Sequence, residues 1–171
     1  IFHKKNLGKG AAIQTAKEYI SGDIVLIQDA DLEYDPQDYK KLIQPIINGE
    51  TQVVYGSRVL GKKRYFVKNF SSIYRIFFNH VLTVFSNVLN KQDLTDAHTC
   101  YKVFSTKLFN SIELRENGFS FCPEITTKIG KKNISIIEIP IAYHGRSYKE
   151  GKKIKFSDGF EAIITILKYK F

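Results

Sequence analysis

The sequence predicts an α/β fold in which a mostly parallel sheet is flanked by helices. Short apolar runs with the length of buried strands alternate with longer segments of helical periodicity, as in proteins whose parallel strands are joined by helices. The length of 171 residues and the hydrophobic content of 43% fit a single domain with a substantial core. We therefore expect residues 1–171 to belong to one domain.

The alternation is regular in the first half of the chain. A glycine-bearing loop at 6–10 precedes a predicted helix over 11–20, in which apolar residues recur at helical spacing. A strand over 23–28 follows, and then a helix over 37–47 that Pro45 kinks or ends. The next strand covers 52–55. This order of helix, strand, helix and strand favours a parallel sheet.

Residues 64–90 break this pattern and predict an amphipathic helical insert. The helix over 71–89 is mostly apolar, and polar residues at 72, 75, 79, 83, 86 and 90 form one narrow stripe. These interruptions make the helix too polar to span a bilayer. Periodicity alone favours a buried helix, and the alternative is a helix that lies in a membrane interface beside the basic residues at 62–68.

The second half of the chain continues with shorter elements. A polar turn from 94 leads to a short strand that ends at 104, and a short helix or turn covers 107–114. A helix is predicted over 123–130, with Pro123 near its first turn. The strand over 134–141 contains Pro140, which indicates an edge strand or a bend. A basic loop at 143–155 precedes a final helix that Ser157 or Asp158 can cap.

The charge and the cysteines restrict the function. A net charge of +9 favours anionic partners, which include nucleic acid, phosphorylated substrates and an anionic membrane surface. Cys100 and Cys122 do not have the spacing of a metal site, and two cysteines are too few for a disulfide scaffold. We expect them to be buried thiols in a reducing compartment.

The most informative motif is Asp29-Ala30-Asp31, which follows the apolar run at 23–28. Ligands of open α/β sheets bind at the carboxyl ends of strands. Two carboxylates at that position can share one divalent cation, and Mg²⁺ completes its shell with water and substrate phosphates. The motif therefore predicts a metal-held diphosphate and a nucleotide-activated substrate. The alternative is an ordinary acidic turn after a strand.

Several further motifs occur in a specific order along the chain. They are Asn-x-Gly-Lys-Gly at 6–10, Asp-x-Asp at 29–31, Gly-Ser-Arg at 56–58, Asp96 ahead of 100–104, Glu124, the run at 138–141 and the basic loop at 146–153. This order resembles the family 2 glycosyltransferases of the GT-A fold, and within them the polyprenyl-phosphate glycosyltransferases such as dolichol-phosphate mannosyltransferases. The resemblance covers nearly the whole chain from Asn6.

The resemblance implies a metal site on the donor side. Asp29 and Asp31 would hold Mg²⁺ or Mn²⁺ on the diphosphate of a nucleotide-sugar donor, and Glu33 would complete the metal shell. Arg58 matches the arginine of the Gly-Ser-Arg motif, and its planar fork suits phosphate oxygens.

The resemblance also implies an acceptor side. Arg146, Lys152 and Lys153 match a basic loop that grips the acceptor phosphate. Asp96 matches an acidic position near the acceptor, and Glu124 lies where many inverting members carry a base. A phosphate acceptor is already ionised near neutral pH, so these two acids would orient groups, whereas a sugar hydroxyl acceptor would need one of them as base.

The implied activity is inverting transfer of a sugar from a nucleotide sugar to a polyprenyl (dolichyl or undecaprenyl) phosphate. The protein would sit peripherally at the cytoplasmic face of a membrane, with the helix in 64–90 in the interface. The family's first strands carry the nucleotide-base pocket and precede Asn6, so we expect an N-terminally truncated GT-A domain that is inactive by itself.

Three other functions stay open at this point. A related family 2 enzyme could extend a glycan on a sugar hydroxyl, and the chain could also be an inactive remnant. A basic nucleic-acid-binding domain is disfavoured, because the lysines and arginines cluster in two loops beside apolar helices and no recognised nucleic-acid motif occurs. We therefore expect no nucleic-acid partner.

Overall fold

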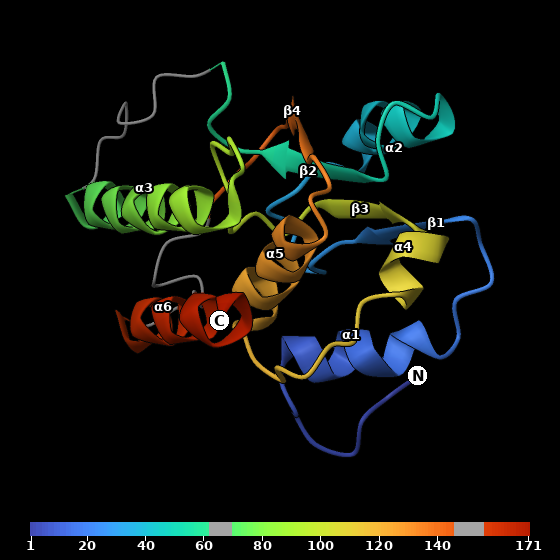
Figure 1. Ribbon diagram of the computed structural model, residues 1–171, viewed down its shortest axis with the longest axis horizontal. Helices are drawn as coiled ribbons and strands as arrows, with labels where there is room; N and C mark the ends of the chain where they lie inside the picture. The colour runs from blue at the N-terminus through green and yellow to red at the C-terminus, as the bar shows by residue number, and fades with distance from the viewer. Residues whose placement is uncertain (62–69, 146–155) are drawn as a thin grey trace.

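The computed structural model describes residues 1–61, 70–145 and 156–171 (Figure 1). Every element expected from the sequence is present, with ends that differ by a few residues. The helices are α1 (Lys9–Lys17), α2 (Tyr39–Ile47), α3 (Phe70–Asn90), α4 (Thr106–Asn110), α5 (Phe121–Lys131) and α6 (Phe156–Lys170). The strands are β1 (Ile24–Ile27), β2 (Val53–Ser57), β3 (Lys102–Ser105) and β4 (Ile137–Pro140).

The described strands form one mixed sheet in the order β1-β3-β2-β4. Both β1 and β2 pair with β3 in antiparallel fashion, and β4 pairs with β2 in parallel fashion. Strands β1, β2 and β4 therefore run in one direction, as predicted, and β3 runs in the other. Because β3 is inserted between β1 and β2, two of the three neighbouring pairs are antiparallel. Strand β4 is an edge strand, which accommodates Pro140.

The strand directions bring four segments to one edge of the sheet. The chain leaves β1, β2 and β4 at this edge, and it enters β3 there because β3 is reversed. The segments at 28–34, 58–61, 95–101 and 141–145 therefore meet, and we call this end of the sheet the site edge. This is the place where open α/β sheets bind ligands.

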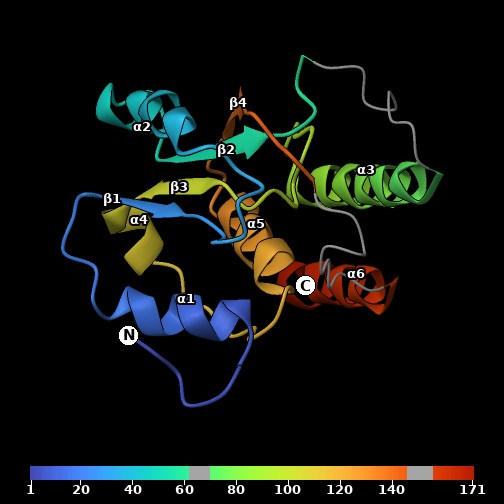
Figure 2. The same ribbon diagram turned by 180° about the vertical axis from the view of Figure 1, so that it is seen from behind.

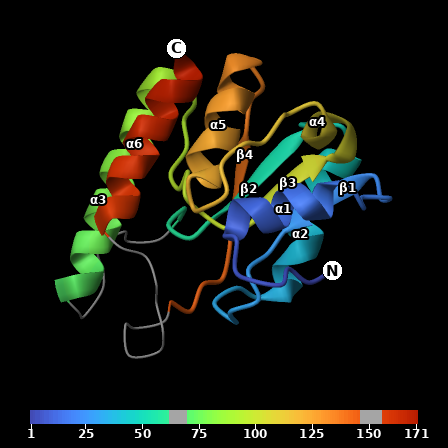
Figure 3. The same ribbon diagram turned by 90° about the horizontal axis from the view of Figure 1, so that it is seen from below.

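The helices form layers on the sheet. Helix α2 covers one face, whereas α1 and α5 lie on the other (Figures 1 and 2). Helices α3 and α6 pack side by side and both contact α5, so they form an outer layer (Figure 3). The core between sheet and α5 contains the fully buried Tyr55, Phe104, Phe121, Ile125 and Ile129.

Helix α3 buries its polar stripe and exposes its apolar face, which is the reverse of the orientation that its periodicity favours. Its polar residues Thr83, Ser86 and Asn90 are buried to 1–2% exposure. Its apolar face is exposed, with Phe77 at 50% and Val88 at 74%. The buried-helix interpretation is therefore wrong for this apolar face. Residues 64–69 of the predicted insert lie outside the described residues, and no helix in the described part is long and apolar enough to cross a membrane.

The amino end of α1 packs closely on the loop at 116–117. The backbone N–H of Ala11 donates to the carbonyl oxygen of Asn117 at 3.1 Å. A Cβ atom on Gly10 would lie 1.9 Å from the carbonyl oxygen of Glu116, so only glycine permits this approach. Gly8 has a φ of 99°, which other residues rarely adopt.

We predict that Gly10→Ala destabilises the fold by about 1–3 kcal/mol, because the added methyl group forces α1 away from its loop. Urea unfolding monitored by circular dichroism measures this free energy. Gly118→Ala is the matched control, since its Cβ meets no atom within 4 Å and its change should stay within about 0.5 kcal/mol. Equal stabilities for the two variants would contradict the close packing of α1.

Candidate functional site

The loop after β1 carries the predicted metal ligands Asp29 and Asp31 to the site edge. An Oδ1 atom of Asp29 lies 2.7 Å from the ammonium of Lys9, which comes from the first turn of α1. Burial opposes the charge of Lys9, but the nearby Cys122, Cys100 and Asp29, in that order, raise its pKa above the ordinary lysine value. A permanent cation therefore stands beside the predicted metal site, and the sequence reasoning missed it.

The carboxylates fit a metal that is shared with a diphosphate. Among the described residues, no group of three His, Cys, Asp or Glu side chains converges to hold a metal ion. Mg²⁺ commonly takes one or two protein carboxylates and completes its shell with water and substrate phosphates. The paired acids Asp29 and Asp31 suit that mode. Asp31 is held in the loop by the backbone N–H of Glu33, which donates to its Oδ1 at 3.2 Å.

The third predicted ligand, Glu33, has another contact. Its side chain is 6% exposed, and its Oε2 accepts a hydrogen bond from the Tyr143 hydroxyl at 3.0 Å. The backbone N–H of His144 donates to the carbonyl oxygen of Glu33 at 2.9 Å. Glu33 therefore joins the metal loop to the segment after β4, and its place in a metal shell stays a prediction.

Arg58 and Asp96 form a bidentate ion pair at the centre of the site edge. Asp96 accepts hydrogen bonds from Arg58 Nε at 2.7 Å, from Nη2 at 2.8 Å and from the Arg58 backbone N–H at 3.1 Å. Asp96 is fully buried, and the guanidinium also lies 5.2 Å from the Tyr143 ring. Burial works to raise the pKa of Asp96, but the Arg58 charge and its hydrogen bonds hold it well below the usual carboxyl range.

Two further side chains hold the loop that carries Asp96. The carboxylate of Glu138 on β4 accepts from the backbone N–H groups of Thr95 at 2.6 Å and of Asp96 at 2.9 Å. Asn79, from the polar stripe of α3, donates to Asp96 Oδ1 at 3.2 Å. The polar stripe that the sequence shows at helical spacing thus binds this loop. Its spacing indicated a face, but its partner could not be known without the fold.

Lys102 is a fully buried lysine that completes the loop. Its ammonium donates to the carbonyl oxygens of Ala97 and Thr99, both at 2.9 Å, and lies 3.7 Å from the Tyr55 ring. Burial lowers the pKa of Lys102 to about 8. This role could not be predicted from local sequence, because Lys102 lies within a strand whose burial depends on the sheet.

Glu124 has the contacts of a loop anchor. Its Oε1 accepts from the backbone N–H of Arg115 at 2.8 Å and from the ammonium of Lys128 at 2.6 Å. Its Oε2 accepts from the backbone N–H of Glu116 at 3.0 Å. These bonds secure the loop on which α1 packs, and the role of Glu124 as a base remains a prediction. Arg146, Lys152 and Lys153 lie outside the described residues.

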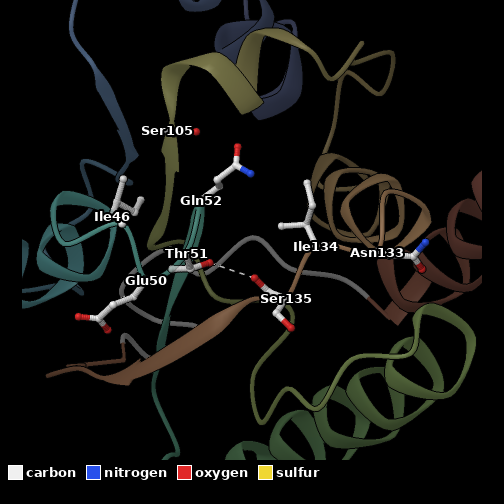
Figure 4. A pocket seen from close by; sticks show the side chains of 9 residues that line it. Ile46, Glu50, Thr51, Gln52, Ser105, Asn133, Ile134 and Ser135 are labelled. Carbon is white, nitrogen blue, oxygen red and sulfur yellow. Dashed lines mark hydrogen bonds between the residues drawn. The ribbon is translucent and has the colours of Figure 1, made fainter.

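A cavity of about 480 Å³ lies at the edge of the sheet opposite to the site edge (Figure 4). It is bordered by the amino end of β2 and the carboxyl end of β3, and Thr51 donates to the carbonyl oxygen of Ser135 at 3.1 Å across it. None of the predicted site residues lines this cavity. The sequence motifs and the sheet topology therefore both favour the site edge.

Comparison with known proteins finds a matching family model and several similar sequences. The sequence model of the family described as glycosyl transferase family 2 matches residues 1–113. The chain is 30% identical to the low-salt glycan biosynthesis hexosyltransferase Agl6 of Haloferax volcanii, over 94% of this chain and 38% of that protein. It is 30% identical to UDP-N-acetylglucosamine–dolichyl-phosphate N-acetylglucosaminyltransferase of Methanococcus voltae, over 99% of this chain and 68% of that protein.

Solved structures confirm the expected GT-A fold. Glucosyl-3-phosphoglycerate synthase of Mycobacterium tuberculosis, in complex with Mn²⁺, uridine diphosphate and phosphoglyceric acid, superimposes with a TM-score of 0.68. The two chains are 19% identical, and the match covers 95% of this chain and 54% of the synthase. The chain thus spans about half of that protein and 38% of the Haloferax relative.

We predict that Asp96→Asn destabilises the protein by about 3–5 kcal/mol at neutral pH, because Arg58 then keeps a buried charge without its partner. The folded pKa of Asp96 is depressed, so its stabilisation is present above the ordinary carboxyl pKa and is lost as the pH falls. The difference between wild type and variant should therefore shrink by about 1 kcal/mol between neutral pH and about pH 3.

Urea unfolding at the two pH values measures this effect. Asp93→Asn is the matched control, because Asp93 is exposed and lies in the same connection between α3 and β3. If the difference in unfolding free energy between wild type and Asp96→Asn is the same at both pH values, ionisation of Asp96 does not contribute to stability.

Proposed function

Because this chain belongs to glycosyl transferase family 2, we propose that the protein transfers a sugar, with inversion, from a nucleotide sugar to a polyprenyl phosphate. The observation that carries the proposal is the meeting of Asp29, Asp31, Arg58 and Asp96 at the site edge. Relatives whose names include a dolichyl or dolichol phosphate support this class of acceptor, among them a dolichol-phosphate mannosyltransferase of Pyrococcus furiosus that is 29% identical.

On the donor side, Asp29 and Asp31 would hold Mg²⁺ or Mn²⁺ against the diphosphate. A bound metal offsets the negative charge that grows on the leaving nucleoside diphosphate. Lys9 contributes a cation of the protein itself at the same place, 2.7 Å from Asp29. As the diphosphate binds, the Lys9 ammonium would contact both the carboxylate and the phosphate oxygens.

On the acceptor side, the ionised Asp96 would orient groups and would not remove a proton. A phosphate acceptor is already a nucleophilic anion near neutral pH. Arg58 is held by Asp96 through Nε and Nη2, so its proposed phosphate contact would use the rest of the guanidinium. Arg146, Lys152 and Lys153 are proposed to grip the acceptor phosphate, and the chain reaches them directly from Tyr143 at the site edge.

We propose that the outer layer of helices lies on the membrane that holds the lipid acceptor. Helix α3 exposes Phe77, Val81, Val84 and Val88, which recur at spacings of four, three and four and so share one face. Helix α6, packed beside α3, exposes a row with the same spacing: Phe160, Ile164 and Leu167, continued by Phe171 directly after its end. Apolar rows of this kind bury themselves at the boundary of head groups and acyl chains.

The activity is tested with full-length protein, labelled nucleotide sugars, and undecaprenyl or dolichyl phosphate, with and without Mg²⁺ or Mn²⁺. We expect metal-dependent transfer, and we expect Asp29→Asn and Asp31→Asn each to lower turnover by on the order of 100-fold or more. Asp23→Asn, at the other end of β1, is the matched control and should retain activity. Metal-independent turnover would remove the role assigned to both aspartates.

The acceptor is tested with Arg146→Ala and Lys152→Ala. Both substitutions should abolish transfer to a lipid phosphate, because the acceptor anion loses its cations. Neither should affect transfer to a sugar hydroxyl. An enzyme that uses only a hydroxyl acceptor and tolerates both changes would instead be a glycan-extending member of the family.

The membrane face is tested with Phe77→Ser and vesicles of neutral phosphatidylcholine. Loss of one large apolar side chain from the face should weaken vesicle binding about tenfold or more. Ile47→Ser on α2 is the matched control, because Ile47 is also exposed but lies on another part of the molecule. If the folded protein binds neither neutral nor anionic vesicles at low salt, the proposal that this face lies on a membrane is wrong.

A further inference from the structure

A second basic region lies outside the proposed site. A pocket of about 410 Å³ is formed between α5, the end of α6 and the connection at 111–115. We call it the basic pocket. Its lining contains one carboxylate, Glu113, and five cations: Arg115, Lys128, Lys131, Lys132 and Lys168. None of the site-edge segments contributes to its lining.

The nearby carboxylates do not neutralise the basic pocket. Three of its cations have acidic partners: Lys128 with Glu124, Lys168 with Glu116 and Arg115 with Glu113. The described part of the chain offers no acidic partner to Lys131 or Lys132, which are both exposed. The positive charge also affects the neighbouring Lys17. Burial is the largest cause that lowers the pKa of Lys17, and the charge of Lys128 lowers it further.

Two of the cations are fixed in place by an aromatic ring. The ammonium groups of Lys128 and Lys168 lie 4.2 and 5.0 Å from the centre of the Tyr169 ring. The Tyr169 hydroxyl donates to Glu116 Oε1 at 2.7 Å, which holds the ring in the pocket. These two lysines are therefore held in place before an anion binds, and less entropy is lost for them on binding.

The basic pocket borders the apolar row of α6. Phe171 ends that row, and it also lines the pocket. If the row enters the boundary of acyl chains and head groups, Phe171 would bring the pocket next to the lipid phosphates. Basic residues beside an amphipathic helix are the arrangement that recognises anionic lipids.

We infer that the basic pocket binds the phosphate head group of an anionic phospholipid. Lysine ammonium groups act on phosphate as point charges, and each basic residue near an anionic membrane strengthens binding. The inference goes beyond the proposed transfer reaction, because it concerns the membrane on which the protein docks and not the acceptor. It rests on the proposed membrane face, which neutral vesicles test separately.

The test measures binding of the full-length protein to vesicles of phosphatidylcholine with and without phosphatidylglycerol. Lys131→Gln combined with Lys132→Gln should weaken binding to the anionic vesicles roughly thirty-fold, which is the loss expected for two basic residues. Binding to neutral vesicles should not change. The matched control is Lys40→Gln combined with Lys41→Gln, a pair of exposed lysines on α2 that lies on the opposite side of the molecule from α6 (Figure 1).

Each other outcome overturns the inference. An equal loss in the two double variants would mean that net charge alone attracts the protein to the vesicles. Inorganic phosphate is added as a competitor at the concentration of the lipid phosphate. If it displaces the protein from the anionic vesicles, the pocket binds a free phosphate ion and does not require a lipid. Because no sugar transfer is measured, these results do not depend on whether the proposed activity is correct.

Discussion

The buried ion pair between Arg58 and Asp96 is the constraint on which the rest of the site edge depends. A buried carboxylate is costly unless it is paired and fully hydrogen-bonded. The Asp96 carboxylate meets this condition by accepting three hydrogen bonds from Arg58 and one from Asn79, and the Asp96 backbone N–H donates a further one to Glu138. These partners come from the end of β2, from α3 and from β4. Asp96 therefore joins three separate elements, two through its carboxylate and the third through its backbone N–H.

The inverted orientation of α3 follows from this constraint. The loop at 94–99 needs donors and acceptors for its backbone, and polar residues of α3 supply them. Thr83 of the stripe accepts from the backbone N–H of Ala97, and Asn87, next to the stripe residue 86, bonds to both backbone groups of Leu94. Because the stripe must face this loop, the apolar face of the helix turns outward. The structure thus links the order of the loop at 94–99 to an exposed apolar surface on α3.

Much of the fold and part of the site could be predicted from the sequence. The strands and helices followed from periodicity, and the Asp29 and Asp31 pair, Arg58 and Asp96 followed from motif order. The reversed β3 did not, since a four-residue apolar strand has the same pattern in either direction. The roles of Lys9, Glu138, Tyr143 and Lys102 were missed as well. Lys9, Glu138 and Tyr143 act through partners in other elements, namely Asp29, Thr95 and Glu33, and Lys102 acts through burial that local sequence does not encode.

The sequence by itself therefore determined the chemistry available to this protein: two carboxylates after a buried strand, an arginine after the next one, a basic excess and an interrupted apolar helix. Only the tertiary structure decided how these groups are used. It paired Arg58 with Asp96, gave Asp29 a lysine neighbour, and turned the apolar face of α3 outward. The physical reason is that local patterns report the spacing of side chains along one element, whereas the partner of a buried charge is chosen by the strand order and packing that satisfy all such charges together.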